Sequence, residues 1–369
     1  MQRQMKNIRS ILFMLILTLT CCEFENTPSS GQSSLYFPPL NSWEWDTISP
    51  GSLDWKTEYL DELFDHLSDN GTRAFIILKN GKIAVEEYFG KNILGTRPFN
   101  RETIWYWASA GKTITSFLVG IAQQENLLNI NDMTSDYLGS GWTSMGKEKE
   151  DLITIRHQLT MTTGLDYTLS DNYCTEPSCL KYRKDAGEQW FYHNAPYTLL
   201  HDVISSASGF NINSYTDDKI ESITGMSGEW IPSGYNNTYW SIPRDMARFG
   251  LLILNRGKWG ENIIMSDSTY FNEMTSSSQQ LNPSYGYLWW LNGKQSIILP
   301  GLALSFNTTL ASNAPDDLIV AAGKNGQFLD VIPSLNIVVV RMGEAPDGSA
   351  VPIQFHNEMW EKINKIIIK

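Results

Sequence analysis

The sequence predicts an α+β protein, in which an antiparallel β-sheet is flanked by helices and an all-α domain is inserted. Strand-like runs occur early, at residues 74–89, and again late, at residues 285–341. Between them, residues 123–235 alternate helical runs with turns and have little strand character. Because two groups of strands separated by helices most simply build one sheet, we expect an α/β part from about 51–122 and 236–369 and a helical part at about 123–235.

The early elements are a helix and a hairpin. An amphipathic run at 57–67 predicts the helix. Two apolar strand-like runs, 74–79 and 82–89, then flank Asn80-Gly81, a pair typical of two-residue hairpin turns. The globular part is therefore expected to begin with a helix that leads into two paired strands.

The later elements follow from the same two periodicities. Residues 241–254 form an amphipathic run with Pro243 near its start, a position that suits a helix. The chain closes with another helical run at 355–368. The strand-like runs between these helices are 285–291, 318–322, 329–332 and 335–341.

Composition indicates a globular protein and excludes a nucleic-acid partner. Of 369 residues, 42% are hydrophobic and 18% are charged, which is enough apolar material for a large core. The formal net charge is −12, and no basic stripe occurs that could follow a phosphate backbone. The five histidines are scattered without metal-ligand spacing, so we expect neither a metal nor a cofactor.

The first 22 residues are typical of a bacterial lipoprotein signal peptide. Basic residues precede an apolar run at 11–17 that is too short for a comfortable membrane span. Cys22 is the predicted lipidation site at the cleavage point, with Cys21 as the alternative, and an ordinary secretory signal is a further alternative. Residues 23–50 are predicted to be a tether, because their first part is rich in Ser, Thr, Pro and Asn. We therefore expect export to the cell envelope (the periplasm) and attachment to a membrane through a lipid anchor.

Two further cysteines, Cys174 and Cys179, lie in the middle of the chain. Disulfides form and persist in oxidising compartments, so in an exported protein these two are expected to pair and pin a surface loop. No histidine stands beside them at ligand spacing, which argues against a metal site.

One Ser-x-x-Lys pair stands where a helix begins. Ser109 and Lys112 lie about one turn apart on the helix that continues through the apolar run 113–122. A serine hydroxyl needs a base to become a nucleophile, and a desolvated lysine amine can supply one. Ser144 and Ser178 have a lysine at the same spacing, but one lies in a loop-like stretch and the other between the two cysteines. The context therefore selects Ser109 as the candidate nucleophile.

Two downstream motifs could complete such a site. Tyr192 and Asn194 form a Tyr-x-Asn motif, and a tyrosine near two ammonium groups can be held ionised to return a proton to the leaving group. Lys324 could bind a substrate carboxylate or polarise this tyrosine, and Gly326 would let a substrate approach the backbone. The amides of the nucleophile and of Gln327 would then form an oxyanion hole.

Three other motifs compete for these roles. One is a second candidate proton shuttle that follows a Thr-Gly-Leu turn, one repeats Tyr-x-Asn in a turn-like stretch, and one repeats the third motif in the predicted hairpin turn. Their settings make the first a loop and the last a hairpin turn, and the repeated Tyr-x-Asn is expected to be structural or to line the pocket. They are, in that order, Ser170-Asp171-Asn172, Tyr235-Asn236-Asn237 and Lys79-Asn80-Gly81.

The order Ser-x-x-Lys, Tyr-x-Asn, Lys-x-Gly resembles the serine β-lactamase and penicillin-binding protein superfamily. It is most similar to the class C-like branch, which also holds D-alanyl-D-alanine peptidases, esterases and nylon-oligomer hydrolases. The resemblance extends over residues 53–343 and includes the flanking stretches 153–165 and 244–250. It implies a β-lactamase-like fold with the active site between an α/β sandwich and an all-α domain. Asn325 replaces the usual threonine of the third motif, so Lys324 could instead be a surface charge at a strand end.

Together, the motifs and the resemblance predict an exported serine hydrolase. Ser109 would attack the carbonyl of a small ester, amide or peptide, with β-lactams and D-amino-acid peptides among the candidates, and form an acyl-enzyme. A true class C-like β-lactamase or D-alanyl-D-alanine peptidase is the alternative, and Asn325 weakens it because such enzymes hold the substrate carboxylate with a lysine–threonine pair. A non-catalytic protein that binds cell-wall peptides is a further alternative, although it would have no reason to keep all three motifs.

Overall fold

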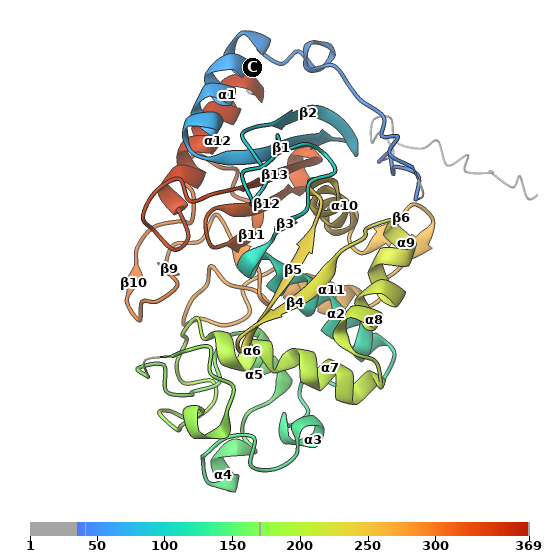
Figure 1. Ribbon diagram of the computed structural model, residues 1–369. Coiled ribbons are helices and arrows are strands. Elements are labelled where there is room, and N and C mark those ends of the chain that lie inside the picture. Colours follow the sequence, from blue (N-terminus) through green and yellow to red (C-terminus); the bar gives the residue numbers. More distant parts are fainter. Residues whose placement is uncertain (1–34, 41, 170, 368–369) are drawn as a thin grey trace, which may run out of the picture. The chain divides into compact units, whose positions relative to one another are not determined.

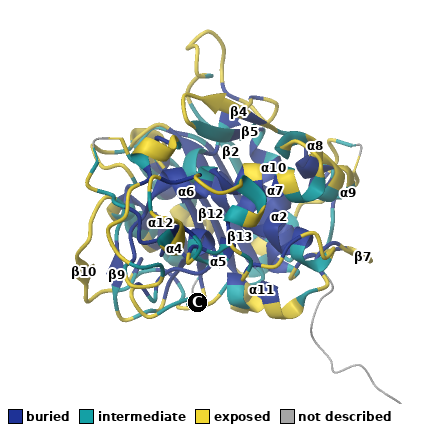
Figure 2. Cartoon of the chain, turned by 90° about the horizontal axis from the view of Figure 1, so that it is seen from below, coloured by how far each residue is buried: buried dark blue, intermediate teal, exposed yellow. Residues whose placement is uncertain are grey.

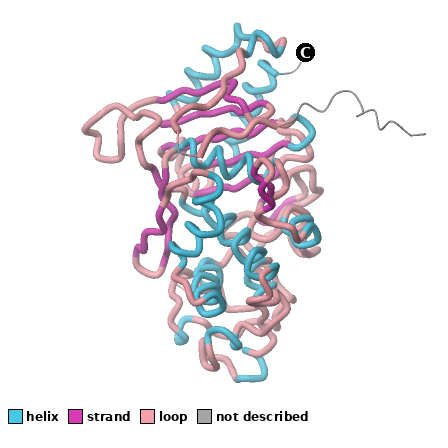
Figure 3. The backbone as a smooth tube through the Cα atoms, turned by 90° about the vertical axis from the view of Figure 1, so that its right-hand side faces the viewer, coloured by secondary structure: helices cyan, strands magenta, loops and turns pink. Residues whose placement is uncertain are grey.

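The computed structural model describes residues 35–40, 42–169 and 171–367, and it confirms the predicted α+β class. Figure 1 shows the sheet and its covering helices in the upper part and a region of helices and loops in the lower part. Figure 3, seen from the side, gathers most strands in the upper part as well. The predicted signal peptide, with Cys21 and Cys22, lies outside the described residues.

The central sheet has six antiparallel strands in the order β2-β1-β13-β12-β11-β8. The early strand β1 pairs with the late strand β13, so the sheet is assembled from both ends of the chain as the sequence predicted. The Asn80-Gly81 turn joins β1 to β2, which confirms the hairpin. The strands are β1 (Thr72–Lys79), β2 (Lys82–Tyr88), β8 (Trp290–Leu291), β11 (Ile319–Gly323), β12 (Gln327–Ile332) and β13 (Ile337–Gly343).

Helices cover the sheet because each turns an apolar stripe toward it. Helix α10 (Pro243–Leu254) packs on β1, β12 and β13, and the ring of its Phe249 lies 6.0 Å from that of Phe117 in α2 (Lys112–Gln124). Helices α1 (Leu60–Asp69) and α12 (Ile353–Ile367) pack on each other. Figure 2 shows α2 and α10 as largely buried. The nucleophile helix predicted from the sequence is therefore part of the core.

The helical part forms its own smaller core around Trp142, Ile153 and Leu180. Its helices are short, and one turn is a π-helix (Asp217–Glu221). The helices are α3 (Ser135–Leu138), α4 (Lys147–Glu150), α5 (Ile155–Leu159), α6 (Asn194–Thr198), α7 (Leu200–Ser208), α8 (Ile212–Thr216) and α9 (Ser222–Thr224).

A second sheet was missed by the sequence analysis. It has the order β3-β5-β4, where β3 is Trp105–Tyr106, β5 is Asn236–Ser241 and β4 is Glu229–Ser233. Strand β4 lies inside the predicted helical part 123–235, so that predicted boundary falls several residues too late. A two-residue strand has no detectable alternation, and β4 contains Pro232, which weakens a strand signal.

The predicted strand at 285–291 is wrong over most of its length. Only its last two residues form β8. Leu288 has a φ of 61°, which a strand cannot hold, and Gly286 lies so close to the backbone of Met274 that an added Cβ would stand 2.3 Å from its carbonyl oxygen. The remaining elements are β6 (Lys258–Trp259), β7 (Asn262–Ile263), α11 (Ser268–Met274), β9 (Ile297–Ile298) and β10 (Ser305–Phe306).

The second half of the predicted tether is docked on the domain. The tether was predicted over 23–50, but residues 35–50 hold backbone hydrogen bonds to the β1–β2 hairpin, among them Tyr36 N–H to the Asn80 carbonyl at 3.0 Å. Trp45 is buried and donates its indole N–H to the Gly81 carbonyl at 2.7 Å. The aromatic residues of this stretch favour packing over a free tether. Within the described part of the chain, no helix has the length and hydropathy that a membrane crossing requires.

Candidate active site

A sharp turn presents Ser109 between the two sheets and the helical part. The turn is a 3-10 segment (Ala108–Gly111) that leads directly into α2, and Ala108 has a φ of 48°, which is strained for a residue with a Cβ. The turn packs against the strands β11, β12 and β5. Ser109 lies at the N-terminal end of α2, where the helix dipole has its positive end. The turn therefore favours negative charge that develops beside Ser109.

Lys112 lies next to this serine and is almost completely buried, with 2% of its surface exposed. Its Nζ is 3.1 Å from Ser109 Oγ. It also lies over the rings of Tyr192 and Tyr197, 5.2 Å and 4.1 Å from their centroids. Burial penalises the ammonium form and lowers the pKa of Lys112 to about 7. A large fraction of this amine is therefore neutral near pH 7 and able to accept the serine proton.

Tyr192 is beside the same hydroxyl but is not ionised, which corrects the sequence prediction. Burial raises its pKa well above the ordinary value, and its hydrogen bond with Ser109 offsets only part of that shift. Its ring stacks on Trp290 at 5.9 Å, inside an apolar environment. Tyr192 is thus a neutral phenol that can donate a proton.

Asn194 begins α6 two residues after this tyrosine, and it is buried. Its Nδ2 donates to Asn172 Oδ1 at 3.3 Å. Its own Oδ1 is buried and has no hydrogen-bond partner among the described residues. A buried carbonyl oxygen without a partner is costly, so Asn194 is suited to accept a hydrogen bond from a substrate.

Lys324 reaches the site from the turn that joins β11 to β12. It is exposed, and it lines both hollows that open at Ser109. The glycine that approaches the serine turn is Gly323 at the end of β11, where an added Cβ would stand 2.4 Å from the Trp107 carbonyl oxygen. Gly326 instead has a φ of 76° and closes the hairpin turn against Arg341.

Gln327 lines neither of the hollows that open at Ser109, which corrects the predicted oxyanion hole. It lies in β12, one strand further from the serine turn than β11. Its buried side chain pairs with Gly343 of β13, donating to the carbonyl at 2.6 Å and accepting from the amide at 3.0 Å. The third motif therefore lies in the turn and not on the strand: β11 ends at Gly323, and Lys324 is the first residue of the turn.

The fold separates most residues of the competing motifs from Ser109, but Asn172 and Asn236 line the hollows that open there. Ser144 bonds to the carbonyl of Leu180 in the helical part, and Tyr235 is exposed in the β4–β5 turn. Ser170 lies outside the described residues. Asn172, the last residue of that rejected motif, lines the site beside Asn194. The only sequence signal for Asn172 was the Ser-Asp-Asn motif, which the sequence assigned to a loop.

A buried polar chain behind Lys112 was also missed. Thr115 Oγ1 lies 3.5 Å from Tyr197 Oη and 2.9 Å from His201 Nε2, and His201 Nδ1 contacts Asn237 Nδ2 at 3.1 Å. Burial and the charge of Lys112 lower the pKa of His201 to about 3, so this histidine is neutral. Burial raises the pKa of Tyr197 well above its ordinary value. The buried groups packed against Lys112 therefore titrate far from neutrality.

The cleft is made of two hollows that share Ser109. One has a volume of about 430 Å³ and borders the second sheet, and the other has about 200 Å³ and borders Tyr192. A larger open hollow of about 660 Å³ at the far end of α2, lined by Gln123 and Asp267 among others, contains none of the motif residues. Within the described ranges, no cluster of His, Cys, Asp and Glu has the composition of a metal site.

The chain matches a known protein family and is similar to known proteins over most of its length. Residues 60–350 match the family described as Beta-lactamase. An uncharacterized protein of Alkalihalophilus pseudofirmus is 24% identical over 302 residues, which are 74% of this chain and 83% of that protein. This similarity extends over most of both chains.

Two solved structures are similar in fold. A putative 6-aminohexanoate-dimer hydrolase from Bacillus anthracis has a TM-score of 0.64 and 17% identity, covering 90% of this chain and 87% of its own. A penicillin-binding protein homolog from Caulobacter crescentus has a TM-score of 0.66 and 12% identity, covering 87% of this chain and 99% of its own.

Proposed function

The chain belongs to the Beta-lactamase family, whose members are serine hydrolases, and on that premise we propose that it cleaves an ester or amide through an acyl-enzyme on Ser109. The observation that carries the proposal is the contact of Ser109 Oγ with Lys112 Nζ at 3.1 Å, together with a lysine pKa of about 7. A nucleophile and a base in this geometry have what acyl transfer needs.

The proposed reaction follows from the protonation states of Lys112 and Tyr192, the two residues beside the Ser109 hydroxyl. Neutral Lys112 accepts the Ser109 proton while Oγ attacks the substrate carbonyl, and a tetrahedral intermediate forms. The leaving group departs when it receives a proton from the Tyr192 hydroxyl, and Lys112 returns a proton to that hydroxyl. Lys112 is then neutral again and can activate the water that releases the acid from Ser109. In this second half-reaction Lys112 takes a proton from the water as it attacks the acyl carbonyl and gives it to Ser109 Oγ as the acid departs, so that water is the only reactant added.

The negative oxygen of the intermediate needs donors that are already in place. We assign this role to the backbone N–H groups of Ser109 and Lys324, which begin the helix turn and the hairpin turn on either side of the cleft. The close packing of Gly323 on the Trp107 carbonyl supports this, because it brings the end of β11 against the serine turn.

Small esters and amides fit this site better than β-lactams. The Asn325 side chain donates to Tyr106 Oη at 2.9 Å, so it is engaged with the second sheet rather than free beside Lys324 to hold a carboxylate. A class C-like β-lactamase or a D-alanyl-D-alanine peptidase remains the second candidate function, favoured by the exposed Lys324 ammonium at the cleft. The fold neighbour titled a putative 6-aminohexanoate-dimer hydrolase is consistent with an amide substrate.

The test is covalent labelling followed by a substrate panel. A fluorophosphonate is expected to add one phosphonyl group to the wild-type protein, and peptide mass spectrometry is expected to locate it on Ser109. p-Nitrophenyl acetate is expected to be turned over faster than nitrocefin. Efficient nitrocefin hydrolysis would select the β-lactamase candidate, and a protein that no ester, β-lactam or phosphonate acylates would be a non-catalytic peptide-binding protein.

Export and lipid anchoring are part of the same proposal. Their support is the basic and apolar N-terminal sequence that ends at Cys21-Cys22. Palmitate fed to expressing bacteria is expected to label the full-length protein and to be absent from Cys22→Ala, with Cys21→Ala as the matched control. Labelling that survives in Cys22→Ala and disappears in Cys21→Ala would move the anchor to Cys21, and no labelling of the wild type would contradict the anchor.

A further inference from the structure

The two hollows of the cleft differ in size. The larger, of about 430 Å³, has the volume of a typical small-molecule site and is lined by Tyr106, Ile231 and Trp240 from the second sheet, beside polar residues such as Asn236. The smaller, of about 200 Å³, lies below that range and is lined by Asn172 and Asn194 on one side and by apolar residues such as Pro300 and Val351 on the other. Both hollows therefore mix polar and apolar groups, and what separates them is the room that each offers.

The position of the proton donor decides which part of a substrate enters each hollow. Tyr192 lines the small hollow and not the large one. A leaving group must reach the Tyr192 hydroxyl to take its proton, so it departs through the small hollow. The acyl group stays bonded to Ser109, and the larger hollow is the space left for it.

Tyr173 stands between the two hollows and lines both of them. The chain holds it on each side. Before it, the Asn172 carbonyl accepts from Ala195 N–H of α6 at 3.0 Å. After it, Cys174 is buried and bonded to Cys179. The tyrosine ring, 39% exposed, is thus carried at the cleft by a backbone that is fixed at both neighbours.

We propose that Tyr173 is a specificity-determining residue that closes the small hollow against large leaving groups. The substrate class that fits is an ester or amide with a bulky acyl group and a small leaving group. This inference rests on the proposed function and adds to it a substrate class and the residue that selects it. Removal of the ring would join the two hollows and relax the limit on the leaving group.

The experiment compares esters in which either the leaving group or the acyl group is enlarged while the other part is kept. Phenyl acetate and 4-phenylphenyl acetate share an acyl group and release phenols of similar acidity, whereas phenyl phenylacetate enlarges the acyl side. The wild type is expected to accept phenyl phenylacetate as well as phenyl acetate and to reject 4-phenylphenyl acetate. Tyr173→Ala is expected to shrink the kcat/KM preference for the small leaving group by about tenfold.

The controls separate specificity from a general loss of activity. Tyr173→Phe keeps the ring and is expected to keep the preference, and so is Tyr182→Ala, which removes an exposed tyrosine after the same loop. The double variant Cys174→Ser, Cys179→Ser frees the loop and is expected to relax the preference in the same direction as Tyr173→Ala.

Two results would overturn the inference while the proposed function stands. One is an equal fall of kcat/KM on all three esters in Tyr173→Ala, and the other is a wild type that accepts the large leaving group and rejects the large acyl group. A wild type that reacts with neither the esters nor a fluorophosphonate would refute the proposed function itself, and the inference with it.

Discussion

Lys112→Met is expected to lower kcat/KM for an ester substrate by about 10³-fold, because it removes the base while keeping a chain of similar length. In the wild type, the neutral form of Lys112 is the active one. Its pKa is lowered from 10.5 to about 7, so the fraction of neutral amine, and with it kcat/KM, rises as the pH increases through about 7 and then levels off. The residual activity of Lys112→Met is expected to lack this rise.

The matched control is Lys181→Met, which removes the exposed lysine of another Ser-x-x-Lys pair and is expected to leave kcat/KM unchanged. Lys112→Met replaces a buried amine, whose charged form burial disfavours, with an apolar group, so its unfolding free energy is expected to stay at or above that of the wild type. A wild-type profile that is flat between about pH 5.5 and 8.5, or a variant that keeps the rise, would reject Lys112 as the base.

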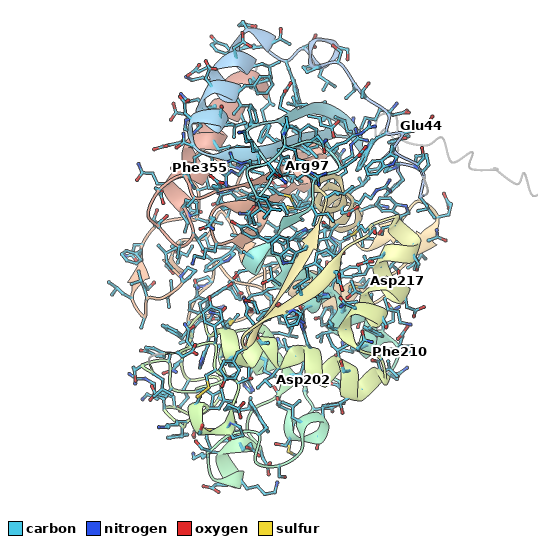
Figure 4. All side chains as sticks on the ribbon, in the orientation of Figure 1. Glu44, Arg97, Asp202, Phe210, Asp217 and Phe355 are labelled. Atoms are coloured by element: carbon cyan, nitrogen blue, oxygen red, sulfur yellow. A yellow bond between two sulfur atoms is a disulfide. The ribbon has the colours of Figure 1, made fainter. Side chains whose placement is uncertain are left out.

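Arg341→Met is expected to lower the unfolding free energy by about 3–5 kcal/mol. Arg341 lies in β13 with none of its surface exposed, and its guanidinium packs over the ring of Phe355 at 5.0 Å. Figure 4 labels Phe355 where α12 meets the sheet. Met would leave five acceptors, two of them in fully buried hydrogen bonds, without their donor: Thr72 Oγ1 and the carbonyls of Asn70, Asn325, Gly326 and Glu344.

Arg341→Met is also expected to lower activity. Two of the lost hydrogen bonds hold Asn325 and Gly326 in the turn that carries Lys324, so kcat/KM is expected to fall in the molecules that remain folded. Urea unfolding measures the first effect, and ester turnover well below the midpoint measures the second. Arg97→Met removes an exposed arginine and is expected to change stability by less than about 0.5 kcal/mol. Equal stability of the two variants would contradict the structural role of Arg341.

Local signals were enough to predict the two-ended sheet and the nucleophile turn. Asn80-Gly81 between apolar runs encodes a hairpin, and an apolar run after Ser109 encodes a buried helix, since both patterns depend on residues near in sequence. The second sheet could not be predicted in the same way. Strand β3 has two residues, and it exists because Trp105 and Tyr106 pair with β5, more than 130 residues later.

The errors at the site have the same origin. The spacing of Lys324 and Gly326 suggested that Gln327 would face the serine. Which residue borders the serine is decided by the strand register, and β11 ends at Gly323, before this motif begins. Likewise, a tyrosine near two lysines suggested a phenolate. Whether a charge is favoured depends on burial, and here the phenol of Tyr192 is buried.

The sequence by itself determined the α+β class, the family resemblance and the pairing of Ser109 with Lys112, because these are carried by short periodic patterns and by one helical turn. The tertiary structure decided that Lys112 is buried enough to be neutral, that Tyr192 keeps its proton, and that Gly323 rather than Gly326 borders the serine. It also brought Asn172 and Tyr173 to the cleft. Solvent exposure and strand register are set by residues distant in the chain, so neither can be deduced from the motifs alone.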